Sequence, residues 1–169
     1  MNQEVVHGIP DKHRIIHEGD IVSLDAGVIY KGYHSDAART HAVGEVSEEA
    51  KKLIQVTKEC FFEGIKYAKA GNHLFDISGA IGRYAEERGY GVVRDLCGHG
   101  IGTALHEAPE IPNYEVGRKG VKLRPGMTLA IEPMINIGTY EVDWLDDDWT
   151  VVTRDGSLSV SYTHLTLPT

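Results

Sequence analysis

Hydrophobic and polar residues alternate along residues 19–44, GDIVSLDAGVIYKGYHSDAARTHAVG, in two runs separated by Lys31-Gly32. An alternation of this kind places successive side chains on opposite faces of a strand, and a lysine–glycine pair suits a two-residue turn. The segment is therefore predicted to form a β-hairpin in which Tyr30 pairs with Tyr33 across the turn.

Two later segments have the apolar spacing of amphipathic helices. Residues 47–71 begin at Ser47, which can cap a helix, and end at Gly71, with apolar residues recurring every three or four positions. Residues 76–88 repeat this spacing and stop before Gly89. Two helices are therefore predicted in the middle of the chain.

The remaining apolar segments are short and predict strands. One strand is expected over residues 91–97 and another over 127–138, after a loop at 107–126 that is rich in proline and glycine. A final hairpin is predicted within residues 149–160, with its turn at Asp155-Gly156. Strands followed by two helices and more strands indicate the α+β class.

Composition narrows the classes of protein that this chain can belong to. Its 169 residues are 41% hydrophobic, which is enough to form the core of one domain. The net charge of −8 argues against nucleic acid or an anionic membrane as a partner. No apolar run is long enough to span a bilayer, the first ten residues lack a signal-peptide pattern, and Cys60 and Cys97 form no CxxC pair. We expect a cytoplasmic protein.

Both ends of the chain differ from the rest. Val5 and Val6 look like the end of a strand that has no room to begin, and residues 160–169, VSYTHLTLPT, carry no formal charge although 25% of the whole chain is charged. We therefore expect a domain over 1–159 that lacks its N-terminal part, followed by an aberrant tail over 160–169.

The predicted hairpin brings two acidic residues together. In its register Asp25 lies opposite Ala38 and Asp36 lies opposite Gly27, so both carboxylates project from the same face, one diagonal step apart. Two carboxylates this close need a proton or a cation between them. A hydrogen bond from Asp25 to a neighbouring loop, and an exposed strand position for Asp36, are the alternatives.

A third acid and a histidine also occupy unexpected positions. Glu132 interrupts the apolar segment TLAIEPMI, where the alternative to a functional role is a buried ion pair with an arginine. The segment CGHGIGTALHEAP, residues 97–109, has glycines at alternate positions on either side of His99 and ends close to His106. Three carboxylates and one imidazole favour Mn, Fe(II), Co or Zn in a two-metal hydrolase over a cysteine-rich structural zinc site.

Other motifs that carry chemistry are absent. The glycine-rich segment lacks the third glycine and the following helix of a dinucleotide-binding loop, and there is neither a P-loop nor a G-x-S-x-G sequence. His7, followed by glycine and proline, either faces a pocket or lies on the surface. The remaining candidates, His13, His17, His34, His41 and His73, are expected on the surface.

Taken in order, these segments resemble the type I methionine aminopeptidases. The resemblance rests on residues 2–10, the two aspartates with ten residues between them, and the sequences CGHGIG, LHEAP, AIEPM and DWTVVTRDGSLS, and it extends to residue 159. It implies an α+β pita-bread fold, an antiparallel sheet flanked by helices that is incomplete at both ends. It also implies a monomeric enzyme that removes the initiator methionine of nascent polypeptides when the next residue is small, and that can associate with the ribosome.

The resemblance also implies roles for individual residues. It assigns two divalent metal ions to Asp25, Asp36, His99 and Glu132. Glu132 would also handle a proton, while His7 and His106 would contact the scissile amide and stabilise the tetrahedral intermediate. Trp149 would line the methionine pocket.

Three departures from the family pattern affect the expected activity. Thr163 stands where the family has a glutamate that bridges both metals, Leu105 replaces an aromatic residue, and the N-terminal helices are absent. The stretch from His106 to Glu132 lacks the insertion of the type II enzymes. A catalytically silent binding protein and a proline-specific aminopeptidase of the same fold remain as alternatives, and whether this chain is active stays open.

Overall fold

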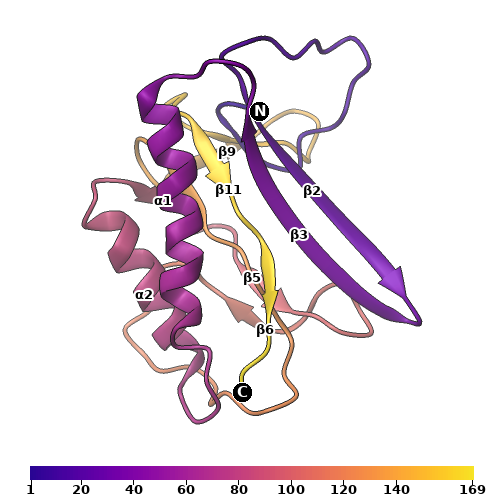
Figure 1. Cartoon of the computed structure of the whole chain (residues 1–169), viewed down its shortest axis with the longest axis vertical. Coiled ribbons are helices and arrows are strands. Elements are labelled where there is room, and N and C mark those ends of the chain that lie inside the picture. The colour runs from indigo at the N-terminus through magenta and orange to yellow at the C-terminus, as the bar shows by residue number, and fades with distance from the viewer.

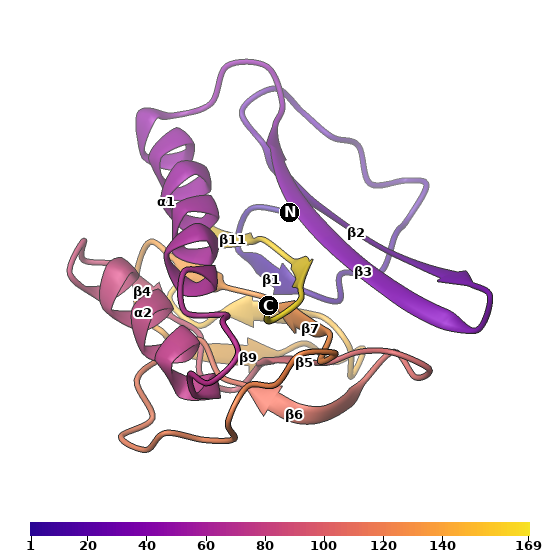
Figure 2. The same ribbon diagram turned by 60° about the horizontal axis from the view of Figure 1, so that its bottom comes forward.

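The molecule has a pair of helices on one flank and a long hairpin on the other. The computed structural model describes all residues, 1–169. The helices are α1 (Glu48–Ile65) and α2 (Leu74–Glu86), and the hairpin consists of β2 (Ile21–Tyr30) and β3 (Tyr33–Ala42). Short strands lie between the helices and the hairpin (Figure 1, Figure 2). The structure therefore confirms the predicted α+β class.

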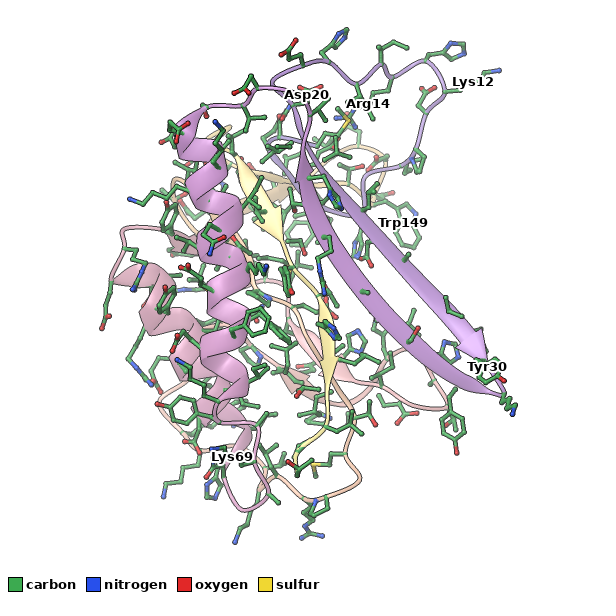
Figure 3. The ribbon with its side chains drawn as sticks, viewed as in Figure 1. Lys12, Arg14, Asp20, Tyr30, Lys69 and Trp149 are labelled. Atoms are coloured by element: carbon green, nitrogen blue, oxygen red, sulfur yellow. The ribbon has the colours of Figure 1, made fainter.

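The β2–β3 hairpin has the predicted register. Tyr30 pairs with Tyr33 and Asp25 pairs with Ala38, so Asp25 and Asp36 project from the same face. Lys31 and the glycine after it have φ angles of 51° and 81°, the left-handed conformation that a two-residue turn of this hand requires. Tyr30 lies at the tip of the hairpin, 69% exposed (Figure 3).

Both predicted helices form, with shifted ends. Helix α1 is capped by Ser47, whose hydroxyl accepts a hydrogen bond from the Ala50 amide at 3.1 Å. It ends at Ile65 rather than at residue 71, because the chain then turns and the Gly71 amide donates to the carbonyl of Leu123 at 3.0 Å. Helix α2 begins earlier than predicted, at Leu74. Neither helix is both long enough and apolar enough to cross a membrane.

Ten short strands complete three antiparallel sheets. The first sheet has the order β1-β10-β9, with β1 (Glu4–Val6), β9 (Val142–Trp144) and β10 (Val151–Thr153). The second has the order β11-β8-β4, with β4 (Gly91–Val92), β8 (Met134–Asn136) and β11 (Ser159–Ser161). The third has the order β12-β7-β5-β6, with β5 (Gly98–Gly100), β6 (Glu107–Ile111), β7 (Leu129–Ile131) and β12 (His164–Thr166).

Several strand predictions were wrong in detail. The strand predicted over 91–97 ends at Val92, and residues 107–111, predicted as loop, form β6. The strand predicted over 127–138 divides into β7 and β8 around Glu132-Pro133, where proline cannot donate to a ladder. The predicted last hairpin does not form, because β10 pairs with β1 and β9 whereas β11 pairs with β8.

Residues 160–169 are packed against the rest of the molecule. They contribute most of β11 and all of β12, and Val160 and Thr163 are 2% and 1% exposed. The predicted boundary after residue 159 falls inside β11. The division into a domain over 1–159 and an aberrant tail stays a prediction.

The main core lies between the helices and the strands behind them. Its fully buried side chains include Leu53 from α1, Ile77 and Ile81 from α2, and Ile131 and Ile135 from the strands. Helix α2 also approaches the backbone of residues 113–115 closely at Gly82. This contact holds the helix against the segment that follows β6.

The close approach at Gly82 leads to a prediction. A glycine-to-alanine change within a helix ordinarily stabilises it by about 1 kcal/mol. At Gly82, however, the new Cβ would lie 2.8 Å from the Cα of Tyr114, which is backbone and cannot rotate away. Gly82→Ala should therefore lower the free energy of unfolding, measured in urea, by about 1–3 kcal/mol.

Gly79, also in α2, provides the matched control. A Cβ there would meet only the ends of the Glu115 and Arg83 side chains, which can move. Gly79→Ala should leave the free energy of unfolding unchanged or raise it. Equal losses in the two variants would contradict the close contact at Gly82.

Candidate metal centre

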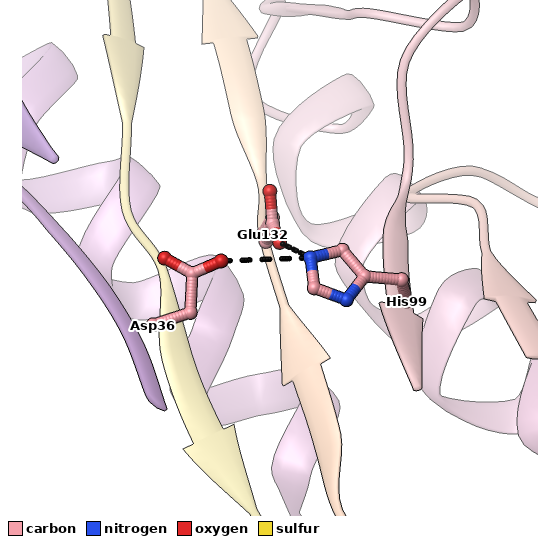
Figure 4. A group of neighbouring side chains, drawn as sticks. All are labelled: Asp36, His99 and Glu132. Atoms are coloured by element: carbon pink, nitrogen blue, oxygen red, sulfur yellow. Dashed lines mark ion pairs between the residues drawn. The ribbon is translucent and has the colours of Figure 1, made fainter. Parts of the chain in front are cut away.

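Three residues from distant parts of the chain meet between the hairpin and the central strands. His99 Nε2 lies 3.5 Å from Asp36 Oδ2 and 2.9 Å from Glu132 Oε1 (Figure 4). One ligand atom from each residue lies within 4.8 Å of the other two. Asp36 comes from β3, His99 from β5, and Glu132 from the junction between β7 and β8. We refer to these three residues as the acid–histidine cluster.

Strand β5, which carries His99, is paired with a neighbouring strand along each of its two edges. It pairs with β7 on one edge, where His99 lies opposite Ala130, and with β6 on the other. A Cβ on Gly98 would collide with the carbonyl oxygen of Ala130, and one on Gly100 with that of Ala108. The glycines on either side of His99 therefore allow β5 to lie close between its neighbours. His99 Nδ1 lies 2.8 Å from the Gly100 carbonyl oxygen, which leaves Nε2 directed at the acids.

The hairpin adds a fourth group, Asp25. Its carboxylate projects from the same face as that of Asp36, one diagonal step away, and lies close enough for the charge of Asp36 to act on it. Asp25 is not part of the group of three residues whose ligand atoms lie within 4.8 Å of one another. Burial, together with the charge of Asp36, raises the pKa of Asp25 to about 6. The contact with His99 lowers the pKa of Asp36 instead. The two carboxylates therefore differ in their affinity for a proton.

The cluster carries more negative charge than its one imidazole can balance. Burial by itself lowers the pKa of His99, but the contacts with Asp36 and Glu132 outweigh it and raise the pKa to about 10. Glu132 Oε1 is buried, and its geometry to His99 is not that of a hydrogen bond, so this oxygen has no hydrogen-bond partner. A buried carboxylate oxygen without a donor, beside two more carboxylates and an imidazole, fits a divalent cation.

The two other predicted histidines lie at the edge of the cluster. The His106 ring is 4.3 Å from the His99 ring and meets it edge-on. His7 has a positive φ of 59°, and its ring centroid lies 6.2 Å from that of Trp149. Trp149 is 62% exposed (Figure 3) and lines neither of the two cavities beside the cluster, so its predicted place in a methionine pocket stays a prediction.

Two cavities, each of about 660 Å³, open beside the cluster and share His7, His99, His106 and Glu132. The first extends toward Leu96, Cys97 and Met134. The second runs along the hairpin and includes Asp25, Asp36, Ile9, Ile16 and Leu105. Sequence reasoning missed Cys97 and Met134 as lining residues, although they lie within the motifs CGHGIG and AIEPM. Together the cavities give the cluster access to a substrate with apolar parts.

Thr163 lies on the same face as the acids of the hairpin. It forms an antiparallel bridge with Ala38, which in turn pairs with Asp25. Residues directly opposite one another in neighbouring strands project to the same side of a sheet. The register therefore places the side chain of Thr163 on the face of Asp25, where this chain has a hydroxyl and no carboxylate.

Comparisons with known proteins agree with this arrangement. The model of Metallopeptidase family M24 matches residues 1–165. The methionine aminopeptidase of Clostridium acetobutylicum is 60% identical over 162 residues, which cover 96% of this chain and 65% of that protein. The chain therefore spans about 65% of the length of the curated relatives that it matches.

Solved structures show the same likeness. The methionine aminopeptidase of Thermotoga maritima matches with a TM-score of 0.96 and 49% identity, covering 99% of this chain and 68% of that one. The Xaa-Pro dipeptidase of Bacillus anthracis matches with a TM-score of 0.73 and 31% identity, covering 94% of this chain and 39% of that one. These matches confirm the predicted pita-bread fold.

The protonation of His99 leads to a pH prediction for the metal-free protein. Its pKa is raised in the folded state, from 6.5 to about 10, so the stability that it contributes is fully present below pH 6.5 and is lost as the pH rises through 10. The free energy of unfolding in urea should therefore fall across this range. His99→Gln should remove that part of the fall, whereas His41→Gln, on the exposed end of β3, should leave it in place. An identical pH profile for His99→Gln and the wild type would contradict the charged cluster.

Proposed function

The chain belongs to metallopeptidase family M24, and on that premise we propose that it is a methionine aminopeptidase, which removes an N-terminal methionine when the second residue is small. The observation that carries this proposal is the convergence of Asp36, His99 and Glu132, with Asp25 beside them. The likeness to the clostridial enzyme supports the choice of activity. The substrate is the free N-terminus of a polypeptide.

Membership of this family implies that the site binds divalent metal. We assign two ions to Asp25, Asp36, His99 and Glu132, a set rich in hard oxygen ligands that suits Mn, Fe(II), Co or Zn. When bound, the cations supply a nucleophile at neutral pH by depressing the pKa of water. The buried Glu132 Oε1, which lacks a hydrogen-bond donor, supports this assignment.

The side chains in and around the cluster have separate roles in the reaction. Glu132 takes a proton at its carboxylate and returns it to the leaving amine. His106, which lines both cavities, donates an N–H to the scissile carbonyl oxygen as negative charge develops there. His7, which also lines both cavities, holds the scissile nitrogen in place. These roles are proposals that rest on the positions of the residues and on the family.

The apolar parts of the cavities support a preference for methionine. Ile9, Ile16 and Leu105 line one cavity, and Leu96 and Met134 line the other. A thioether side chain fits surfaces of this kind because it is flexible and apolar. Trp149, whose ring lies 6.2 Å from that of His7 and outside the two cavities, is proposed as a further aromatic contact for the substrate. A small second residue would be required for steric reasons.

A proline-specific peptidase is the second candidate, and the structural likeness to the Xaa-Pro dipeptidase favours it. The two enzymes would share metal ligands and differ in the pocket. The higher identity and TM-score of the methionine aminopeptidase favour the first candidate. A silent binding protein of this fold would show degraded ligands, yet four of the five family ligands are present here, with Thr163 in place of the fifth.

The test combines metal content with peptide cleavage by the purified chain. After loading with manganese or cobalt, the protein should release methionine from Met-Ala-Ser and leave Ala-Pro intact. His106→Ala should lower turnover by about 100- to 1,000-fold with unchanged metal content, because it removes a donor to the developing oxyanion. Cleavage of Ala-Pro alone would favour the second candidate. Metal binding without cleavage of either peptide would favour a binding protein.

Thr163 is a further point at which the site can be tested. Thr163→Glu would add a carboxylate on the face of Asp25 and should tighten cobalt binding by about 100-fold or more, because a charged partner of a buried ion contributes several kcal/mol. The affinity is measured by titration of cobalt absorbance. Thr166→Glu, which adds the same charge at the end of β12, three residues further along the chain, should have little effect. Equal affinities in the wild type and Thr163→Glu would place residue 163 outside the site.

A further inference from the structure

Asn113 is a fully buried polar residue behind the acid–histidine cluster. Its side chain is 0% exposed, and Nδ2 donates a hydrogen bond to the backbone carbonyl of Glu132 at 2.8 Å. The other amide atom, Oδ1, is buried without a hydrogen-bond partner. A carbonyl can only accept, so the amide must present its nitrogen to Glu132 and leave its oxygen unpaired.

The carbonyl of Glu132 lies at the junction between two sheets. Strand β7 before it pairs with β5 and β12, whereas β8 after it pairs with β4 and β11. No backbone amide donates to this carbonyl, although the next one, on Pro133, accepts from the Tyr162 amide at 3.2 Å. An unpaired buried carbonyl here would be unfavourable. The Asn113 amide is therefore the group that satisfies and orients the backbone of Glu132.

Helix α2 packs closely against the backbone of residue 113. Gly82 of α2 lies so close that a Cβ on it would sit 3.2 Å from the Asn113 carbonyl oxygen. Asn113 therefore joins a rigid helix to a junction in which Pro133 restricts the backbone. A shift of this junction would move the Glu132 carboxylate relative to His99 Nε2, which now lies 2.9 Å away.

We infer that Asn113 is a positioning residue that aims the Glu132 carboxylate at the metal centre. The inference rests on the proposed function, since it takes Glu132 as a metal ligand. Retaining an amide with one unpaired atom in a buried position is unfavourable by itself. The bond to Glu132 supplies the reason for an asparagine at this position.

The test uses a matched pair of variants. Asn136, in β8, is also 0% exposed, donates from Nδ2 to a backbone carbonyl, that of Thr139 at 2.9 Å, and has an unpaired Oδ1. Asn113→Leu and Asn136→Leu thus remove the same kind of bond, but only the first bond holds Glu132. The cobalt affinity of each full-length variant is titrated by absorbance, and the melting temperature is measured without metal.

We expect both variants to lose thermal stability, and Asn113→Leu alone to bind cobalt about 10- to 100-fold more weakly, as observed when residues behind a metal ligand are replaced. Unchanged affinity in Asn113→Leu, or an equal loss in Asn136→Leu, would overturn the inference. If either leucine variant does not fold, Asn113→Ala and Asn136→Ala repeat the comparison with less steric strain.

Crystal structures of the metal-free variants separate this inference from the proposed function. In Asn113→Leu the Glu132 carboxylate should move away from His99 Nε2, whereas in Asn136→Leu it should stay in place. A wild-type chain that binds no cobalt would overturn the proposed function, and the two metal-free structures would still decide whether Asn113 positions Glu132. An unmoved carboxylate in Asn113→Leu would overturn the positioning role.

Discussion

The repulsion among three carboxylates around one imidazole is the constraint on which the rest of this structure depends. Asp36 and Glu132 lie beside His99 in a partly buried space, Asp25 is close enough for its charge to interact with theirs, and a single proton on that histidine cannot balance the three carboxylates. Such an arrangement persists only when rigid elements hold each group in place. A divalent cation between the carboxylates would relieve this repulsion. The same group of acids is therefore unfavourable without metal and suited to bind it.

The elements that hold these groups differ in rigidity. His99 is on a strand that is paired along both edges, and Glu132 is fixed at a junction between sheets by Asn113. The two aspartates, in contrast, come from a two-stranded hairpin, a unit that is marginally stable by itself. Backbone bonds from His34 to Gly102 and between Ala38 and Thr163 attach this hairpin to the body. The position of Asp25 and Asp36 therefore depends on contacts made far away in the sequence.

Residues 159–166 have a structural role beside the site. Strand β11 extends the sheet of β8, and β12 extends that of β7, so these two short strands flank the junction that carries Glu132. Thr163 lies between them, in register with Ala38. The register places the side chain of Thr163 on the face of Asp25. The segment thus supports the fold of the site while contributing a hydroxyl to its face.

The sequence by itself determined the local features: the hairpin and its register, the two helices, and the acids that are unusual in apolar surroundings. Alternation, capping residues and the cost of burying a charge act over a few residues, so they can be recognised in Asp25, Ser47 or Glu132 without a structure. The tertiary structure decided which strands pair, why the chain breaks at Glu132-Pro133, and that Asn113 supports this break. Short strands such as β10 and β11 carry no pattern that selects a partner, because pairing between distant segments depends on packing of the whole chain.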